Sequence, residues 1–71
     1  MNEKLGLTQR QAEALEFLRA FFAERGYSPS YAEIGRACGC NLSGVQRIVQ
    51  ALEDRGHVSR RRGAWRSISL L

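Results

Sequence analysis

The feature that most constrains this chain is a helix signal that occurs three times, a capping box at the start and a glycine at the end. In a capping box, Ser or Thr and a Gln or Glu three residues later bond backbone N–H groups that the first helical turn leaves unpaired. A glycine after the last turn accepts the left-handed conformation that commonly ends a helix. The signals run from Thr8 to Gly26, from Ser30 to Gly39 and from Ser43 to Gly56. They predict three helices in a single domain, 1–71, with residues 1–6 as a flexible terminus.

Each predicted helix has one apolar face. The first has the broadest, made of Ala14, Leu15, Phe17, Leu18, Phe21 and Phe22. An arc this broad predicts contact with more than one neighbouring element. We assign the phenylalanines to the core rather than to a ligand pocket, because a domain of 8.0 kDa needs its aromatic side chains for its own interior. The narrower faces are Tyr31, Ile34 and Cys38 in the second helix, and Val45, Ile48, Val49 and Leu52 in the third.

The outer face of the third helix has unusual chemistry. Lys and Glu commonly cover a solvated helix face, whereas here Ser43, Gln46, Arg47 and Gln50 occupy it near the N-terminal end. Such side chains can hydrogen-bond base edges and phosphates. We therefore predict that helix 43–55 is a recognition helix for the major groove of DNA. Arg47 would read guanine or a phosphate, and the two glutamines would read adenine edges.

The segment before the recognition helix completes a helix-turn-helix pattern. Pro29 interrupts the chain after the first helix, so the second helix is short, from Tyr31 to about Cys38. Residues 39–42 form the expected turn to the third helix. A short helix, a brief glycine-containing turn and a second helix with a polar outer face are typical of helix-turn-helix proteins.

The segment after the recognition helix predicts a β-hairpin. Residues 57–60 and 65–70 suit short strands, and residues 60–64 form a basic, glycine-containing turn between them. A hairpin beside a helix-turn-helix is called a wing. The predicted fold class is therefore mainly α with a small β-hairpin, a winged helix-turn-helix of three helices and a two-stranded wing.

Positive charge is concentrated in the half of the chain that contains the recognition helix. Residues 1–40 have five basic and five acidic residues, whereas residues 41–71 have six basic and two acidic ones, which accounts for the net charge of +4. Arginines 60–62 crowd the hairpin turn, where like charges repel unless an anion lies across them. The alternative is that this basic turn is only a solvated loop. The position of the turn beside the recognition helix favours contact with phosphates instead.

The sequence offers little for metal binding or catalysis. The spacing of Cys38 and Cys40 is too short for a zinc site, and only His57 remains as a further soft ligand. We expect the cysteines to be half-buried packing residues, kept reduced. No catalytic triad and no glycine-rich phosphate loop is present, which predicts a protein that is not an enzyme, with no cofactor and no small-molecule ligand. No signal peptide or membrane-spanning run is evident either, so we expect a soluble, cytoplasmic protein.

Several runs of residues also match a known family. They are Leu7-Thr8-Gln9-Arg10-Gln11, Gly26 with Pro29-Ser30, Ala32-Glu33-Ile34, Ser43-Gly44-Val45, Arg47-Ile48, Ala51-Leu52-Glu53-Asp54-Arg55-Gly56, and Gly63-Ala64 with Arg66, Ile68 and Leu70. In these runs the chain resembles the N-terminal DNA-binding domain of LexA, the repressor of the bacterial SOS response, and most closely its alphaproteobacterial versions. The resemblance implies a winged helix-turn-helix and a sequence-specific transcriptional repressor that binds double-stranded DNA.

The resemblance also implies which residues contact the DNA. Base contacts fall at the turn and the start of the recognition helix, at Asn41, Ser43, Gly44, Gln46 and Arg47, and the outer-face pattern adds Gln50. Contacts to the DNA backbone are expected from the start of the second helix and from the wing, at Ser30, Tyr31, Arg60, Arg61, Arg62 and Arg66.

LexA proteins also have a self-cleaving peptidase domain, which supplies most of their dimer contacts and which 71 residues cannot contain. We therefore expect either an excised DNA-binding domain or a free-standing small regulator. In the second case, self-cleavage and control of the SOS response do not carry over. A lone domain makes few DNA contacts, so we expect a homodimer on a palindromic or repeated site, or help from a partner protein.

Two other functions fit parts of the sequence. A winged helix can be a protein-interaction module, such as a small phage or accessory regulator that docks on another protein. Docking predicts exposed apolar anchors on the outer face of 43–54, where only Gly44 and Ala51 lie at the edges, so Trp65 is the main candidate anchor. A nucleic-acid-binding protein without sequence preference needs only the basic turn. The glutamines on the outer face of the third helix would be unexpected in such a protein.

Overall fold

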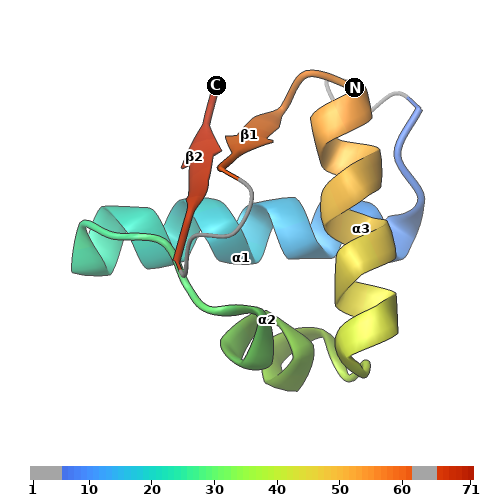
Figure 1. The fold of residues 1–71 in the computed structure, drawn as a ribbon, viewed down its shortest axis with the longest axis horizontal. Helices are drawn as coiled ribbons and strands as arrows, with labels where there is room; N and C mark the ends of the chain where they lie inside the picture. Colours follow the sequence, from blue (N-terminus) through green and yellow to red (C-terminus); the bar gives the residue numbers. More distant parts are fainter. Residues whose placement is uncertain (1–5, 62–65) are drawn as a thin grey trace.

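The computed structural model describes residues 6–61 and 66–71 and confirms the predicted fold class. Its elements are α1 (Gln9–Arg25), α2 (Tyr31–Cys38), α3 (Leu42–Asp54), β1 (Val58–Arg60) and β2 (Ile68–Leu70). α1 crosses the middle of the molecule, α2 lies to one side of it with α3 rising from its end, and the two strands lie on the other side (Figure 1). The predicted terminus up to residue 5, the middle of the hairpin turn and Trp65 lie outside the described residues.

α1 and α2 begin at the predicted capping boxes. In α1, the Thr8 hydroxyl accepts a hydrogen bond from the backbone N–H of Gln11, and the side-chain oxygen of Gln11 accepts one from the backbone N–H of Thr8, both at 3.1 Å. Ser30 and Glu33 make the same reciprocal pair in α2, at 3.1 and 2.8 Å. Each of the three helices is followed by its predicted glycine in the left-handed conformation, with φ of 79°, 70° and 82°.

The N-cap of α3 lies two residues earlier than the sequence pattern indicates. Its N-cap is Asn41, whose side-chain oxygen accepts a hydrogen bond from the Gly44 N–H at 2.9 Å. The prediction of a capping box between Ser43 and Gln46 is wrong, because Asn caps helices as well as Ser does and stands earlier in the chain. The connection between α2 and α3 is correspondingly shorter than the expected turn at 39–42.

Replacing each candidate cap in turn tests this assignment. Asn41→Ala is expected to lower the free energy of unfolding by about 1 kcal/mol, because the Gly44 N–H loses its partner. The matched control is Ser43→Ala, which removes a hydroxyl that takes no part in the cap and should change stability by less than about 0.5 kcal/mol. Urea denaturation of both variants gives the comparison. A larger loss for Ser43→Ala would contradict the assignment.

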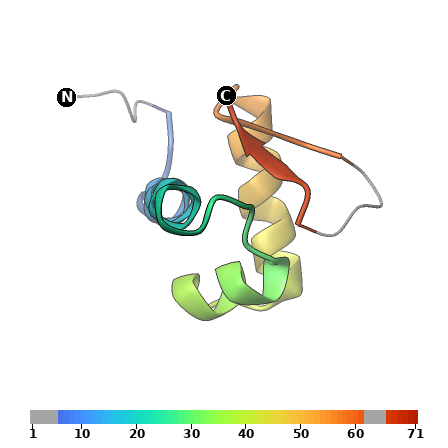
Figure 2. The same cartoon turned by 90° about the vertical axis from the view of Figure 1, so that its left-hand side faces the viewer.

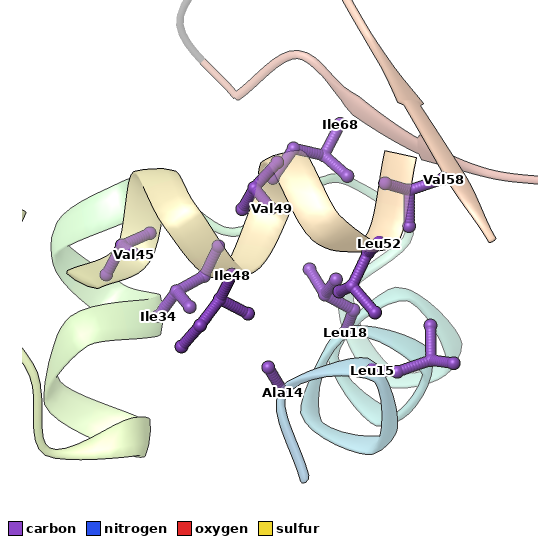
Figure 3. Packing of buried hydrophobic residues seen from close by; sticks show 10 residues of the cluster. All are labelled: Ala14, Leu15, Leu18, Ile34, Val45, Ile48, Val49, Leu52, Val58 and Ile68. Carbon is purple, nitrogen blue, oxygen red and sulfur yellow. The ribbon is translucent and has the colours of Figure 1, made fainter. Parts of the chain in front are cut away.

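The hydrophobic core lies where the three helices meet, and the hairpin closes it (Figure 3). Figure 2 looks along the axis of α1 and shows α3 beside it and α2 beneath. The buried apolar residues are Ala14, Leu15, Leu18, Phe21, Ile34, Val45, Ile48, Val49, Leu52, Val58 and Ile68. Phe17 packs against the core and its ring centre lies 5.8 Å from that of Phe21, which supports the assignment of these two phenylalanines to the core. Phe22 is half-buried and lines a groove instead. Cys38 and Cys40 are free and half-buried beside the core, as predicted.

The connection between α2 and α3 lies close against Gly35 of α2. The carbonyl oxygen of Gly35 accepts a hydrogen bond from the Cys40 N–H at 3.0 Å. A Cβ atom on Gly35 would lie only 2.7 Å from the Cys40 carbonyl oxygen, so any larger residue would push the connection away from α2. This glycine therefore sets the approach of the recognition helix.

The hairpin register determines which way its side chains face. The antiparallel pairs are Val58 with Leu70, Ser59 with Ser69, and Arg60 with Ile68. Successive residues of a strand face opposite sides, and directly paired residues share a side. Because Val58 and Ile68 are buried, Arg60 lies on the inner side of the hairpin, toward the helices.

Within the described ranges, no helix is long and apolar enough to cross a membrane.

Candidate nucleic-acid interface

One open groove brings together most of the residues predicted to contact DNA. It lies between the start of α2, the outer face of α3 and the hairpin. Its lining is Ser30, Tyr31, Ala32, Ser43, Gln46, Arg47, Gln50, Ala51, Asp54, Arg60, Arg61, Arg66 and Ser67. Of the predicted residues, Asn41 and Gly44 lie outside this lining, and Arg62 lies outside the described residues. Segments that are far apart in the sequence therefore form one surface.

The outer face of α3 is exposed as its pattern predicted. Ser43, Gln46, Arg47 and Gln50 are all exposed, whereas the opposite face of the helix is buried. The exposed guanidinium groups of Arg47 and Arg61 make no hydrogen bond or ion pair with other described residues. The groove therefore offers two available cations next to neutral side chains that both donate and accept hydrogen bonds.

Asn41 and Gly44 lie at the start of α3, and Asn41 lines a neighbouring groove. The side-chain oxygen of Asn41 is used as the N-cap, so its amide NH₂ is the part that remains for another partner. Gly44 is half-buried, and a Cβ atom there would lie 3.0 Å from the Cys40 Cβ. Base contacts by these two residues stay a prediction.

Leu42 is an exposed residue that lines the neighbouring groove and that the sequence pattern did not identify as a site residue. It lies in the first turn of α3 and is 58% exposed. A cap at Ser43 leaves Leu42 in the turn, whereas the observed cap at Asn41 puts it in the helix. An apolar side chain at this position is suited to the methyl group of thymine in the major groove.

The start of α2 already holds an ion pair. Arg66 donates hydrogen bonds to both carboxylate oxygens of Glu33, at 2.9 and 3.2 Å, and a third to the Ser28 carbonyl at 2.9 Å. Its guanidinium also stacks 5.0 Å from the centre of the Tyr27 ring. Arg66 thus connects the start of β2 to the start of α2, and its contact with the DNA backbone, like that of Ser30, stays a prediction.

The ion pair makes stability depend on pH at the acidic end. The hydrogen bonds from Arg66, followed by the backbone N–H of Ser30, lower the pKa of Glu33 to about 2 from an ordinary 4.5. A lowered pKa stabilises the fold above pH 4.5, and this contribution is lost as the pH falls from 4.5 toward 2. Glu33→Gln should therefore show a lower Tm at neutral pH and a shallower fall of Tm across this window, measured by circular dichroism. An unchanged acid slope would contradict this.

The sequence pattern assigns Arg60 both to the end of the first strand and to the start of the basic turn, and in the structure it is the last residue of β1. Its guanidinium bonds side chains of α2 and α3. Arg61 is the exposed member of the arginine run among the described residues. The contribution of Arg62 lies outside them.

Metal binding has no support in the described part of the chain. The side chains of His, Cys, Asp and Glu there do not come together in groups of three or more that could hold a metal ion.

Taken with the fold, this groove defines a class of protein. A helix-turn-helix whose second helix exposes polar and cationic side chains, flanked by a hairpin, is a winged helix-turn-helix DNA-binding domain.

Comparison with known proteins identifies the family. The chain belongs to the LexA DNA-binding domain family, whose model matches residues 4–67. It is 43% identical over 65 residues to the LexA repressor of Halorhodospira halophila, covering 90% of this chain and 29% of that repressor. It is 41% identical over 56 residues to the LexA repressor of Sorangium cellulosum, covering 78% of this chain and 24% of that repressor. The chain thus spans only about a quarter of the length of these relatives, and the particular likeness to alphaproteobacterial members stays a prediction.

Proposed function

We propose that this chain is the DNA-reading part of a LexA-like transcriptional repressor and binds double-stranded DNA sequence-specifically. The observation that carries the proposal is the exposed row of Ser43, Gln46, Arg47 and Gln50 along a groove with available cations. Membership in a DNA-binding family and the repressor names of its relatives support it. A regulator of this kind acts by binding rather than by catalysis, and a cytoplasmic location goes with it.

In this proposal α3 enters the major groove with its N-terminal half foremost. Arg47 bonds guanine or a phosphate, and Gln46 and Gln50 present amides to adenine edges. Each good bidentate pair gives about 1–3 kcal/mol of discrimination against the wrong base. The sequence preference of the domain therefore rests on a few side chains of one helix.

The rest of the groove holds the DNA backbone. The exposed guanidinium of Arg61, at the end of β1, makes no hydrogen bond or ion pair with other described residues, which supports a role in neutralising a phosphate. The start of α2 lies on the other side of the groove, at Ser30 and Tyr31, where helix-terminal N–H groups favour an anion. Such contacts make binding fall steeply with salt concentration.

Useful occupancy requires more than one domain. A single domain has few base contacts, so we expect weak binding by one copy and tighter binding by two copies on a palindromic or repeated site. The spacing of the half-sites would then report the geometry of the homodimer.

Selection from a random duplex DNA pool at two salt concentrations, followed by sequencing of the bound fraction, tests the proposal. We expect a short enriched motif, and a repeated half-site if two copies bind together. Binding without a motif would indicate a non-specific binder. No binding even at low salt would overturn the DNA function and favour a docking module, for which the exposed Leu42 is the first anchor to test.

A further inference from the structure

Arg60 is bonded on three sides by residues of the two helices that form the groove. Its Nε donates to a Glu53 carboxylate oxygen at 3.1 Å, and its Nη1 donates to the Tyr31 hydroxyl at 3.0 Å. Its Nη2 donates to the side-chain oxygen of Gln50 at 2.5 Å. Only 16% of the Arg60 side chain is exposed, and the negative charge of Glu53 balances the positive charge of Arg60. Unlike Arg61, Arg60 is already paired with a carboxylate of the same chain, that of Glu53.

Gln50 is held on both sides of its amide. The oxygen accepts from Arg60, and the nitrogen donates to an Asp54 carboxylate oxygen at 2.9 Å. An arginine can only donate and an ionised carboxylate can only accept. The two neighbours are therefore compatible with only one orientation of the Gln50 amide, with its oxygen toward the wing.

We propose that Arg60 is a positioning residue that sets which way the Gln50 amide faces the DNA and so determines the preference at one base pair. The inference rests on the proposed function, because it requires α3 to lie in the major groove. It also revises the expectation that Arg60 binds the DNA backbone.

The orientation of the amide matters because a base edge is directional. Adenine offers a donor at N6 and an acceptor at N7, and glutamine matches both only when its oxygen and nitrogen face them in the right order. Each amide group keeps a second hydrogen or lone pair after its internal bond, so Gln50 can be held by Arg60 and Asp54 and still bind a base. A glutamine oriented before binding loses less conformational entropy on contact.

The experiment compares Arg60→Met with Arg61→Met, which remove the same charge from neighbouring residues. Binding of each to the selected motif and to all its single-base-pair variants is measured over a range of salt concentrations. Arg60→Met should leave the salt dependence unchanged and reduce discrimination by about tenfold at the one base pair where Gln50→Ala also loses it. Arg61→Met should make the fall of log affinity with log salt less steep by about 0.9 and keep every base preference.

Glu53→Gln separates orientation of Gln50 from loosening of the wing. It weakens the ion pair of the same guanidinium without touching Gln50. If base preference survives Glu53→Gln and is lost in Arg60→Met, the effect passes through Gln50. A double variant of Arg60 and Gln50 should be no worse at that base pair than Gln50→Ala alone.

A different result would overturn the inference. If the salt dependence of Arg60→Met is less steep by about 0.9 and its base preference is intact, Arg60 is a phosphate contact. Loss of preference in Gln50→Ala but not in Arg60→Met would show that Gln50 needs no positioning. If the unchanged protein enriches no motif, the proposed sequence-specific function is wrong. The salt dependence of binding to random duplex DNA, compared between Arg60→Met and the unchanged protein, still decides whether Arg60 binds a phosphate.

Discussion

Replacing Leu52 with alanine is expected to destabilise this domain by about 2–5 kcal/mol, through lost burial and the cavity left behind. Leu52 is fully buried in α3 and belongs to the cluster that joins the three helices and the hairpin (Figure 3). Domains are commonly stable by about 0.05–0.15 kcal/mol per residue, so a chain of 71 residues has little to spare. Thermal unfolding should show a Tm lower by about 10 °C or more.

Leu42→Ala is the matched control for this result. It makes the same chemical change in the same helix, at a side chain that is 58% exposed. Its effect on stability should stay within about 0.5 kcal/mol. Equal losses at the two leucines would contradict the assigned core.

Replacing Arg47 with alanine is expected to weaken binding to the selected DNA motif by about 1–3 kcal/mol, which is about fivefold to 150-fold in affinity. Arg47 is exposed in the middle of the groove, with no partner among the described residues, so its loss removes a contact without disturbing the fold. The Tm should therefore remain close to that of the unchanged protein. Fluorescence anisotropy with a labelled duplex gives the affinity.

The pattern of the loss identifies what Arg47 contacts. A guanine contact predicts that discrimination disappears at one base pair and that affinity for random DNA changes little. A phosphate contact predicts a uniform loss of affinity for all sequences and a salt dependence that is less steep by about 0.9. The control is Arg19→Ala, which removes the same charge from the exposed side of α1, away from the groove. Equal losses for both variants would mean that net charge alone drives binding.

The two early helices and the polar row of α3 were predictable because their causes are local. A capping box needs residues only three positions apart, and the face of a helix follows from a repeat of 3.6 residues. Thr8 and Ser30 therefore marked their helices correctly. The start of α3 was misjudged because Asn41 and Ser43 are equally good caps two residues apart, and nothing in the local pattern ranks them.

The roles of the arginines depend on contacts that no local pattern contains. In the sequence Arg60 and Arg61 look alike, yet the register of β1 against β2 turns the first inward and leaves the second exposed. The bonds of Arg60 to Tyr31 and of Arg66 to Glu33 join residues 29 and 33 positions apart. The sequence by itself therefore determined the helices, their apolar faces and the exposed polar row of α3. Only the packing of the hairpin against α2 and α3 decided which cations remain available to DNA, because ion pairing depends on distances that arise after folding.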